Sequence, residues 1–189
     1  MKYFEANEVH GETLRVLKER PNPYVAYTIH KDNWVYSSNL NQTNKDYCKE
    51  NNINLSESYN MGGTIVASKG DIDIALFKID GWDIGKNLLK RVKEYLDTKI
   101  ENVSINNNDL LIDNKYKVMS YASINAGDRY IYVVVHISIN PDKELINKIC
   151  NKEMIKIPRG LGDYGVTTKE MEELMEKITN EEVLNNEWY

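Results

Sequence analysis

The feature that most constrains the fold is a succession of short segments rich in β-branched and aromatic residues, with few helical patterns between them. The clearest segment runs from Asp71 to Ile79, where Ile72, Ile74 and Leu76 alternate with two aspartates. A period of two predicts a half-buried strand, with Asp71 and Asp73 on the face away from the core.

The same signal recurs along the chain. We expect further strands at residues 24–29, 34–37, 53–56, 64–67, 110–113, 116–124 and 130–139. We expect helices at 83–96, 142–150 and 168–180, and a weak one at 4–17. Thr167 and Glu170 have the spacing of a capping box, and Asp113-Asn114 that of a hairpin turn. Strand meanders interleaved with a few helices predict an α+β architecture.

Composition narrows the class of protein. The 189 residues suit a single domain over 1–189, and 41% hydrophobic with 28% charged residues excludes general disorder. No apolar run could span a membrane, and the N-terminus lacks a secretory signal. Two cysteines favour a reducing, cytoplasmic setting. A net charge of −5 argues against a nucleic-acid partner. We interpret the run Asn106-Asn107-Asn108 as coding bias of an AT-rich genome, of a bacterium or one of its phages.

Two features could carry chemistry. Gly62-Gly63 precedes the apolar strand at 64–67, and paired glycines let backbone amides approach a ligand closely, although such a pair is also a common structural turn. Lys117 lies between apolar neighbours in the strand at 116–124, where it is either a fixed cation for a carbonyl or phosphate oxygen or a solvated edge lysine. Alternation places Lys117, Met119 and Tyr121 on one face and Ser120 and Ala122 on the other.

The histidines and cysteines show no pattern that predicts a catalytic or metal site. His10, His30 and His136 are isolated in the sequence and lack metal-ligand spacing, so we assign no metal site. Cys48 and Cys150 fall within helical patterns, where packing is their expected role.

The order of these features carries a resemblance. Residues 60–71, Asn-Met-Gly-Gly-Thr-Ile-Val-Ala-Ser-Lys-Gly-Asp, resemble the signature of the lipoate–protein ligase, octanoyltransferase and biotin ligase superfamily: a glycine-rich turn, an apolar strand, a His-Asp pair and Gly-Asn or Gly-Asp. Residues 34–42 are similar to its first strand and binding loop, 114–122 to its lysine strand (Lys-Ile/Val-x-Gly-x-Ala), and 133–142 and 157–167 to its later segments. The resemblance covers most of the chain.

The resemblance implies a fold and an activity. The fold would be mixed, mostly antiparallel sheets packed with helices, as in the ligase catalytic domain. The enzyme would activate lipoate or octanoate with ATP and Mg²⁺ as an acyl-adenylate, and pass the acyl group to a lysine of a lipoyl domain or other carrier protein. Lys117 would be catalytic, its buried amine at the mouth of an apolar tunnel, because a cation placed where negative charge gathers stabilises the transition state. Substrate- or nucleotide-binding residues would be Asn39, Asn60, Gly62, Gly63, Thr64, Ser120 and Ala122. Ile65, Val66, Ile74 and Val135 would line the acyl slot or serve as ordinary core.

The chain also departs from the pattern. Residues 57–60 lack the usual arginine, Ala67 and Ser68 replace the His-Asp pair, and Met61 and Ser120 replace glycines. No accessory C-terminal domain is expected. These departures favour an alternative, a phage-encoded, non-catalytic protein of the same fold that binds a small ligand or a partner protein.

Overall fold

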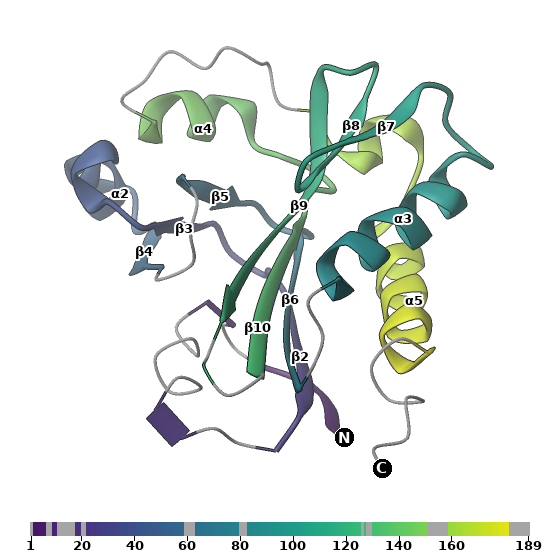
Figure 1. Ribbon diagram of the computed structural model, residues 1–189. Helices are drawn as coiled ribbons and strands as arrows, with labels where there is room; N and C mark the ends of the chain where they lie inside the picture. The colour runs from purple at the N-terminus through teal and green to yellow at the C-terminus, as the bar shows by residue number, and fades with distance from the viewer. Residues whose placement is uncertain are drawn as a thin grey trace.

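The computed structural model describes residues 2–6, 9–10, 18–19, 22–58, 63–79, 83–125, 127, 130–150 and 159–181. Its centre is a seven-stranded sheet in the order β1-β2-β6-β10-β9-β8-β7 (Figure 1). The strands are β1 (Lys2–Glu5), β2 (Tyr24–Ile29), β6 (Ile72–Ile79), β7 (Val103–Asn106), β8 (Asp109–Ile112), β9 (Tyr116–Asn125) and β10 (Tyr130–Ile137). β1 pairs with β2 in parallel, and the other pairs are antiparallel. The expected α+β class is therefore confirmed.

Two long helices cover one face of this sheet. α3 (Ile84–Leu96) and α5 (Thr168–Thr179) lie side by side at the right of Figure 1. Their apolar stripes, which include Leu88 and Met175, pack in one cluster with Ile74 and Val135 of the central strands. Since a helix buries the stripe that recurs at its own period, this cluster is the main core. We call this side of the sheet the helix face and the opposite side the second face.

A smaller three-stranded sheet stands beside the large one. Its order is β4-β3-β5, with β3 (Trp34–Ser37), β4 (Asn54–Glu57) and β5 (Ile65–Ala67). Helices α2 (Lys45–Glu50) and α4 (Lys143–Ile149) accompany it at the upper left of Figure 1. Two short 3₁₀ helices, η1 (Leu40–Gln42) and η2 (Leu161–Tyr164), complete the described elements. Val35, Cys48, Val66 and Ile149 form the apolar cluster between β3, β5, α2 and α4. The packing expected of Cys48 is thus confirmed.

Several local predictions hold. Thr167 and Glu170 form the expected capping box at the start of α5. Asp113 and Asn114 both have φ near +55° (55° and 52°), in the left-handed region that suits the turn between β8 and β9. The helix expected at 4–17 is wrong at its start, because Lys2–Glu5 is a strand; residues 7–8 and 11–17 lie outside the described residues.

The asparagine run has a structural role that the coding-bias interpretation missed. Asn106 ends β7 and faces Asp109 at the start of β8, so Asn107 and Asn108 form a two-residue hairpin connection. Asn107 has φ of 54°, a conformation that asparagine tolerates better than most residues. Among the described residues, no helix is long and apolar enough to cross a membrane.

Candidate functional site

The second face of the large sheet carries three rows of side chains, each running across β2, β6, β10 and β9. Residues directly opposite one another on neighbouring strands share a face, so the strand register defines the rows. The polar row is Thr28, Asp73, His136 and Ser120; the small-residue row is Ala26, Ala75, Val134 and Ala122; the bulky row is Tyr24, Phe77, Tyr132 and Ile124. The sequence-predicted residues Ser120 and Ala122 therefore end two adjacent rows.

A β-bulge brings Lys117 to the same face. Leu110 pairs with Met119 and Leu111 with Lys117, which leaves Val118 as the extra residue of β9. Strict alternation had placed Lys117 on the face opposite Ser120 and Ala122, and that prediction is wrong because the bulge shifts the period by one. The ammonium of Lys117 lies 3.0 Å from Asp109 Oδ1, and its side chain is 50% exposed. The buried amine expected from the resemblance is therefore not observed.

Asp73 is the centre of the polar row. The imidazole nitrogens of His30 and His136 lie 2.6 and 2.7 Å from its two carboxylate oxygens, and His10 Nε2 lies 3.1 Å from Oδ2. All four side chains are buried. The three histidines that are isolated in the sequence thus converge on one carboxylate. The alternation in the sequence had placed Asp73 on the face away from the core, but its side chain is fully buried. We call these four residues the Asp73 cluster.

The electrostatics of the Asp73 cluster favour an ion pair. Burial raises the pKa of Asp73, but His10 and His136 outweigh it and hold that pKa well below its ordinary value. Burial lowers the pKa of His136, but Asp73 and Asp71 outweigh it, and the net direction is upward. Lys117 opposes that rise, which places its charge within electrostatic reach of His136. Lys117 and His136 therefore lie near one another at one end of the polar row, each beside a carboxylate, Asp109 for Lys117 and Asp73 for His136.

Asp71, the aspartate of the resembling Gly-Asp step, has a structural role. Its carboxylate accepts hydrogen bonds from the backbone N–H groups of Ser68 (2.8 Å), Ile139 (2.7 Å) and Asn140 (3.2 Å). The hydroxyl of Ser68 accepts one from the N–H of Asp142 at 2.8 Å. Burial raises the pKa of Asp71. His136 and these three N–H groups act to lower that pKa, but the effect of burial is larger. Both side chains tie the turn before β6 to the chain between β10 and α4.

The small sheet reaches the polar row through aromatic rings that stack on His10. The rings of Tyr36 and His10 stack with their centroids 4.0 Å apart, and Trp34 stacks on Tyr36 at 5.7 Å. Register places Ile65 opposite Tyr36 and Ala67 opposite Trp34, on the same face of the small sheet. Ala67, at the position where the resemblance expects a histidine, is fully buried. The small sheet is thus joined to the Asp73 cluster through stacked aromatic rings.

The other predicted site residues lie at the end of β3. The hydroxyls of Ser37 and Thr64 are 2.9 Å apart, and the Ser37 hydroxyl accepts a hydrogen bond from the N–H of Asn39 at 3.3 Å. The Asn39 side chain caps η1. Gly63 adjoins Thr64, whereas Asn60 and Gly62 lie outside the described residues. The structure therefore groups Asn39, Gly63 and Thr64 at β3, and Lys117, Ser120 and Ala122 on β9. The roles of these residues stay predictions.

The residues proposed for an acyl slot are mostly core. Ile74 and Val135 pack in the main cluster on the helix face, and Val66 packs with α2 and α4. For these three, the core alternative is correct. A different apolar surface lies on the second face, where three residues of the small-residue row and three of the bulky row form one cluster with Val9. Sequence reasoning missed Asp73, His10 and Val9. The only available signal was an aspartate within a strand whose neighbours are all apolar.

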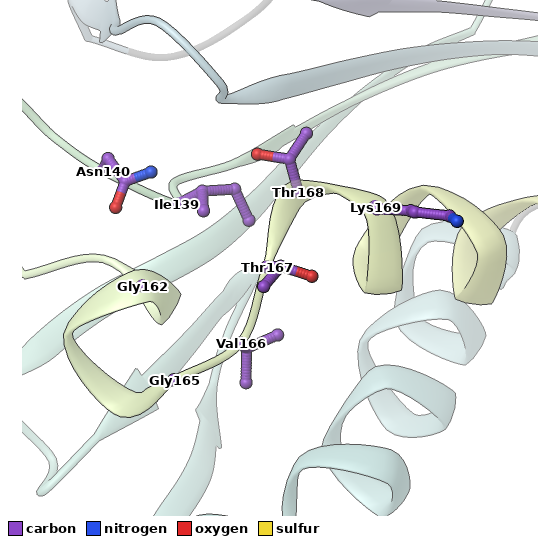
Figure 2. Close-up of a pocket in the computed structure, with 8 residues that line it drawn as sticks. All are labelled: Ile139, Asn140, Gly162, Gly165, Val166, Thr167, Thr168 and Lys169. Carbon is purple, nitrogen blue, oxygen red and sulfur yellow. The ribbon is translucent and has the colours of Figure 1, made fainter.

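The cavities that open on the described surface include two of different size. The larger, about 440 Å³, lies where β10 leads into η2 and α5 (Figure 2). Its hydroxyls are already engaged, since Thr168 donates to the carbonyl of Gly70 and Thr167 bonds Glu170. The smaller, about 170 Å³, is lined by Thr28, His30 and Trp34 among others, and so adjoins the polar row. Within the described residues, no group of three or more His, Cys, Asp or Glu could hold a metal ion.

Comparison with solved structures identifies the fold. A protein of Thermoplasma acidophilum described as a lipoate protein ligase, with bound lipoic acid, has a TM-score of 0.75 at 15% identity, over 97% of this chain and 86% of that one. Lipoate-protein ligase A bound with ATP has a TM-score of 0.71 at 16% identity, over 93% and 78% of the two chains. A bi-partite T. acidophilum ligase solved with its E2 lipoyl domain has 0.73 at 15%, over 97% and 84%.

Biotin protein ligases share the fold more distantly. The enzyme from Aquifex aeolicus has a TM-score of 0.57 at 12% identity, over 97% of this chain and 69% of that one. No protein-family model matches the sequence, and no curated protein matches it. The chain therefore has the fold of lipoate–protein and biotin protein ligases, at an identity that shows the fold alone.

Proposed function

We propose that this chain is a lipoate–protein ligase-like enzyme that binds the acyl chain of lipoate or octanoate over the small-residue row. The substrate carboxylate attacks the α-phosphate of ATP to form an acyl-adenylate and release pyrophosphate. The amine of a lysine on a lipoyl-type carrier domain then takes the acyl group as an amide and releases AMP. The observation that carries the proposal is the placement of Lys117, the polar row and the small-residue row on one face of a ligase fold.

The three rows match the chemistry of such a substrate. The side chains of Ala26, Ala75 and Ala122 are small enough for an apolar chain to lie close to the sheet, and a row across four strands about 4.8 Å apart spans roughly 14 Å. The ammonium of Lys117, on the same face of β9, would then meet the substrate carboxylate in place of Asp109, while His136 of the adjacent polar row stays paired with Asp73. An amphipathic ligand laid across the strands would thus meet apolar and cationic surface at the correct ends.

Lys117 can exchange its present partner for a substrate. Its ion pair with Asp109 is half-exposed, and exposed pairs contribute about 0–1 kcal/mol, so an anionic substrate group can displace the carboxylate at little cost. In a site closed by ligand, the ammonium would stabilise charge that develops on the acyl phosphate. Mg²⁺ would enter with the ATP phosphates rather than in a protein cage, as is usual for this ion.

A second function is favoured by specific observations. The half-exposed Lys117 is neutralised by Asp109, and Ala67 cannot supply the imidazole of the related enzymes. A protein with these features could bind the acyl ligand, or a partner protein, without catalysis.

One experiment separates the two functions. Purified protein is incubated with ATP, Mg²⁺ and lipoate or octanoate, and pyrophosphate and acyl-adenylate are measured. We expect turnover, and a loss of about a hundredfold or more in Lys117→Ala, because a lost electrostatic contact to the reacting group costs that much. Lys115→Ala is the matched control, because it removes the same charge two residues before Lys117. The Lys115 ammonium lies 5.1 Å from the centre of the Tyr116 ring, and we expect wild-type activity from this variant. Inert wild type with a ligand-induced rise in melting temperature would favour the binding protein.

A further inference from the structure

We propose that Val9 and His10 occupy the acyl site and hold the described structure in a self-blocked state, so that an acyl ligand must displace this segment before it binds. The inference rests on the proposed function for the identity of the ligand, but the blocking contact itself stands on geometry. It concerns regulation of the site by two residues of the chain itself.

The side chain of Val9 packs on the small-residue row. It is fully buried, and it packs in one cluster with Ala26, Ala75 and Val134, three of the four residues in that row. The hydroxyl of Tyr132, in the bulky row, donates a hydrogen bond of 2.7 Å to the Val9 carbonyl. A row of alanines on a central sheet would otherwise leave a void, which protein interiors avoid. Val9 therefore fills the volume that an acyl chain needs.

His10 blocks the polar row in the same way. It is fully buried, lies 3.1 Å from Asp73 Oδ2, and stacks on Tyr36 at 4.0 Å. It thus stands between the large sheet and the small sheet, over the polar row. The two neighbouring residues together cover both the apolar and the polar part of the site.

The contact is suited to competition. A ligand that binds only the open arrangement pays for opening, so its apparent affinity falls by the fraction of molecules that are open. Weakening the hold of Val9 raises that fraction. The small cavity beside Thr28 and His30 adjoins the polar row and offers a first point of contact.

The test compares two valine-to-alanine variants in the full-length chain. Val9→Ala removes two methyl groups from the blocking contact, whereas Val103→Ala removes the same groups from the helix face, in the cluster that packs around α3. We expect Val9→Ala to bind octanoate about tenfold more tightly than wild type, because each buried methylene contributes several-fold to an equilibrium. Val103→Ala should bind as wild type does, and both variants should show cooperative melting.

A second readout separates this inference from the proposed function. An anilinonaphthalene sulfonate dye reports an opened apolar site without requiring a ligase substrate. We expect dye fluorescence to rise several-fold in Val9→Ala and not in Val103→Ala, as a void opens above the alanines. A rise in dye binding without octanoate binding would support the blocked site and overturn the acyl substrate. Equal dye binding by the two variants would overturn the inference, whatever octanoate does.

Discussion

At the scale of single residues, the Asp73 cluster is costly to bury and so must be satisfied internally. An isolated carboxylate in a protein interior is strongly destabilising, and His30 and His136 each contact one oxygen of Asp73. His10 adds a third imidazole. The same contacts that stabilise the carboxylate bring β2, β6 and β10 together with the segment at residues 9–10.

The pair between His136 and Asp73 predicts a pH-dependent stability. Because the pKa of His136 is raised in the folded chain, its contribution is fully present below the ordinary histidine pKa of about 6.5 and is lost as the pH rises through the raised value. The pKa of Asp73 is lowered, so its own contribution is fully present above the ordinary aspartate pKa of about 3.9 and is lost as the pH falls toward the lowered value.

We therefore expect the difference in unfolding free energy between wild type and His136→Gln to be largest near about pH 5.5 and to shrink by about pH 9. Urea unfolding at several pH values measures it. Lys93→Gln, which breaks the exposed pair of Lys93 with Asp97, is the control and should show little pH dependence across this range. A difference that grows with pH would contradict the ion pair.

At the scale of elements, the sequence predicted caps and turns, which depend on neighbouring residues, but not contacts between distant parts of the chain. The capping box of α5 and the Asp113-Asn114 turn each depend on neighbouring residues, so their sequence spacing was sufficient. Asp73 meets His30 and His136 across 43 and 63 residues, and no sequence period encodes those contacts. The order of motifs indicated the ligase fold correctly, because order survives when individual site residues change.

The bulge in β9 shows how one backbone irregularity changes a candidate site. Alternation is a reliable rule only while every residue has a partner, and Val118 has none across from β8. No residue type in β9 predicts the bulge. The bulge decides whether Lys117 shares a face with Ser120.

The start of α3 depends on a glycine in contact with β9. A Cβ added at Gly85 would overlap the ring of Tyr121 at several atoms. An alanine normally stabilises a helix by up to about 1 kcal/mol relative to glycine, but overpacking costs about 1–3 kcal/mol. We expect Gly85→Ala to lower the unfolding free energy by about 1–2 kcal/mol.

A double-mutant cycle checks the cause. Tyr121→Ala alone leaves a void, and in that background Gly85→Ala should become neutral or stabilising, because the ring that it overlaps is gone. Thermal melts of the four proteins give the coupling energy. Additive effects would mean that α3 does not rest on Tyr121.

At the scale of the whole molecule, the small sheet joins the large sheet in part through the second face. Tyr36 of β3 stacks on His10, and His10 in turn contacts Asp73 at the centre of the large sheet. On the other side, α3 and α5 close the helix face through an apolar cluster that does not include His10 or Tyr36. The two sides should therefore respond separately to mutation.

Amide hydrogen exchange of His10→Ala tests this separation. Loss of the ring removes both the stack with Tyr36 and the contact with Asp73, so the small sheet should open more often while α3 stays packed. We expect exchange in β3 (Trp34–Ser37) to accelerate about tenfold or more, and exchange in α3 (Ile84–Leu96) to stay near the wild-type rate. Val103→Ala should give the reverse pattern, because β7 packs against α3. Equal acceleration in β3 and α3 would show that the molecule opens as one unit, and unchanged β3 would show that the small sheet is held by contacts other than His10.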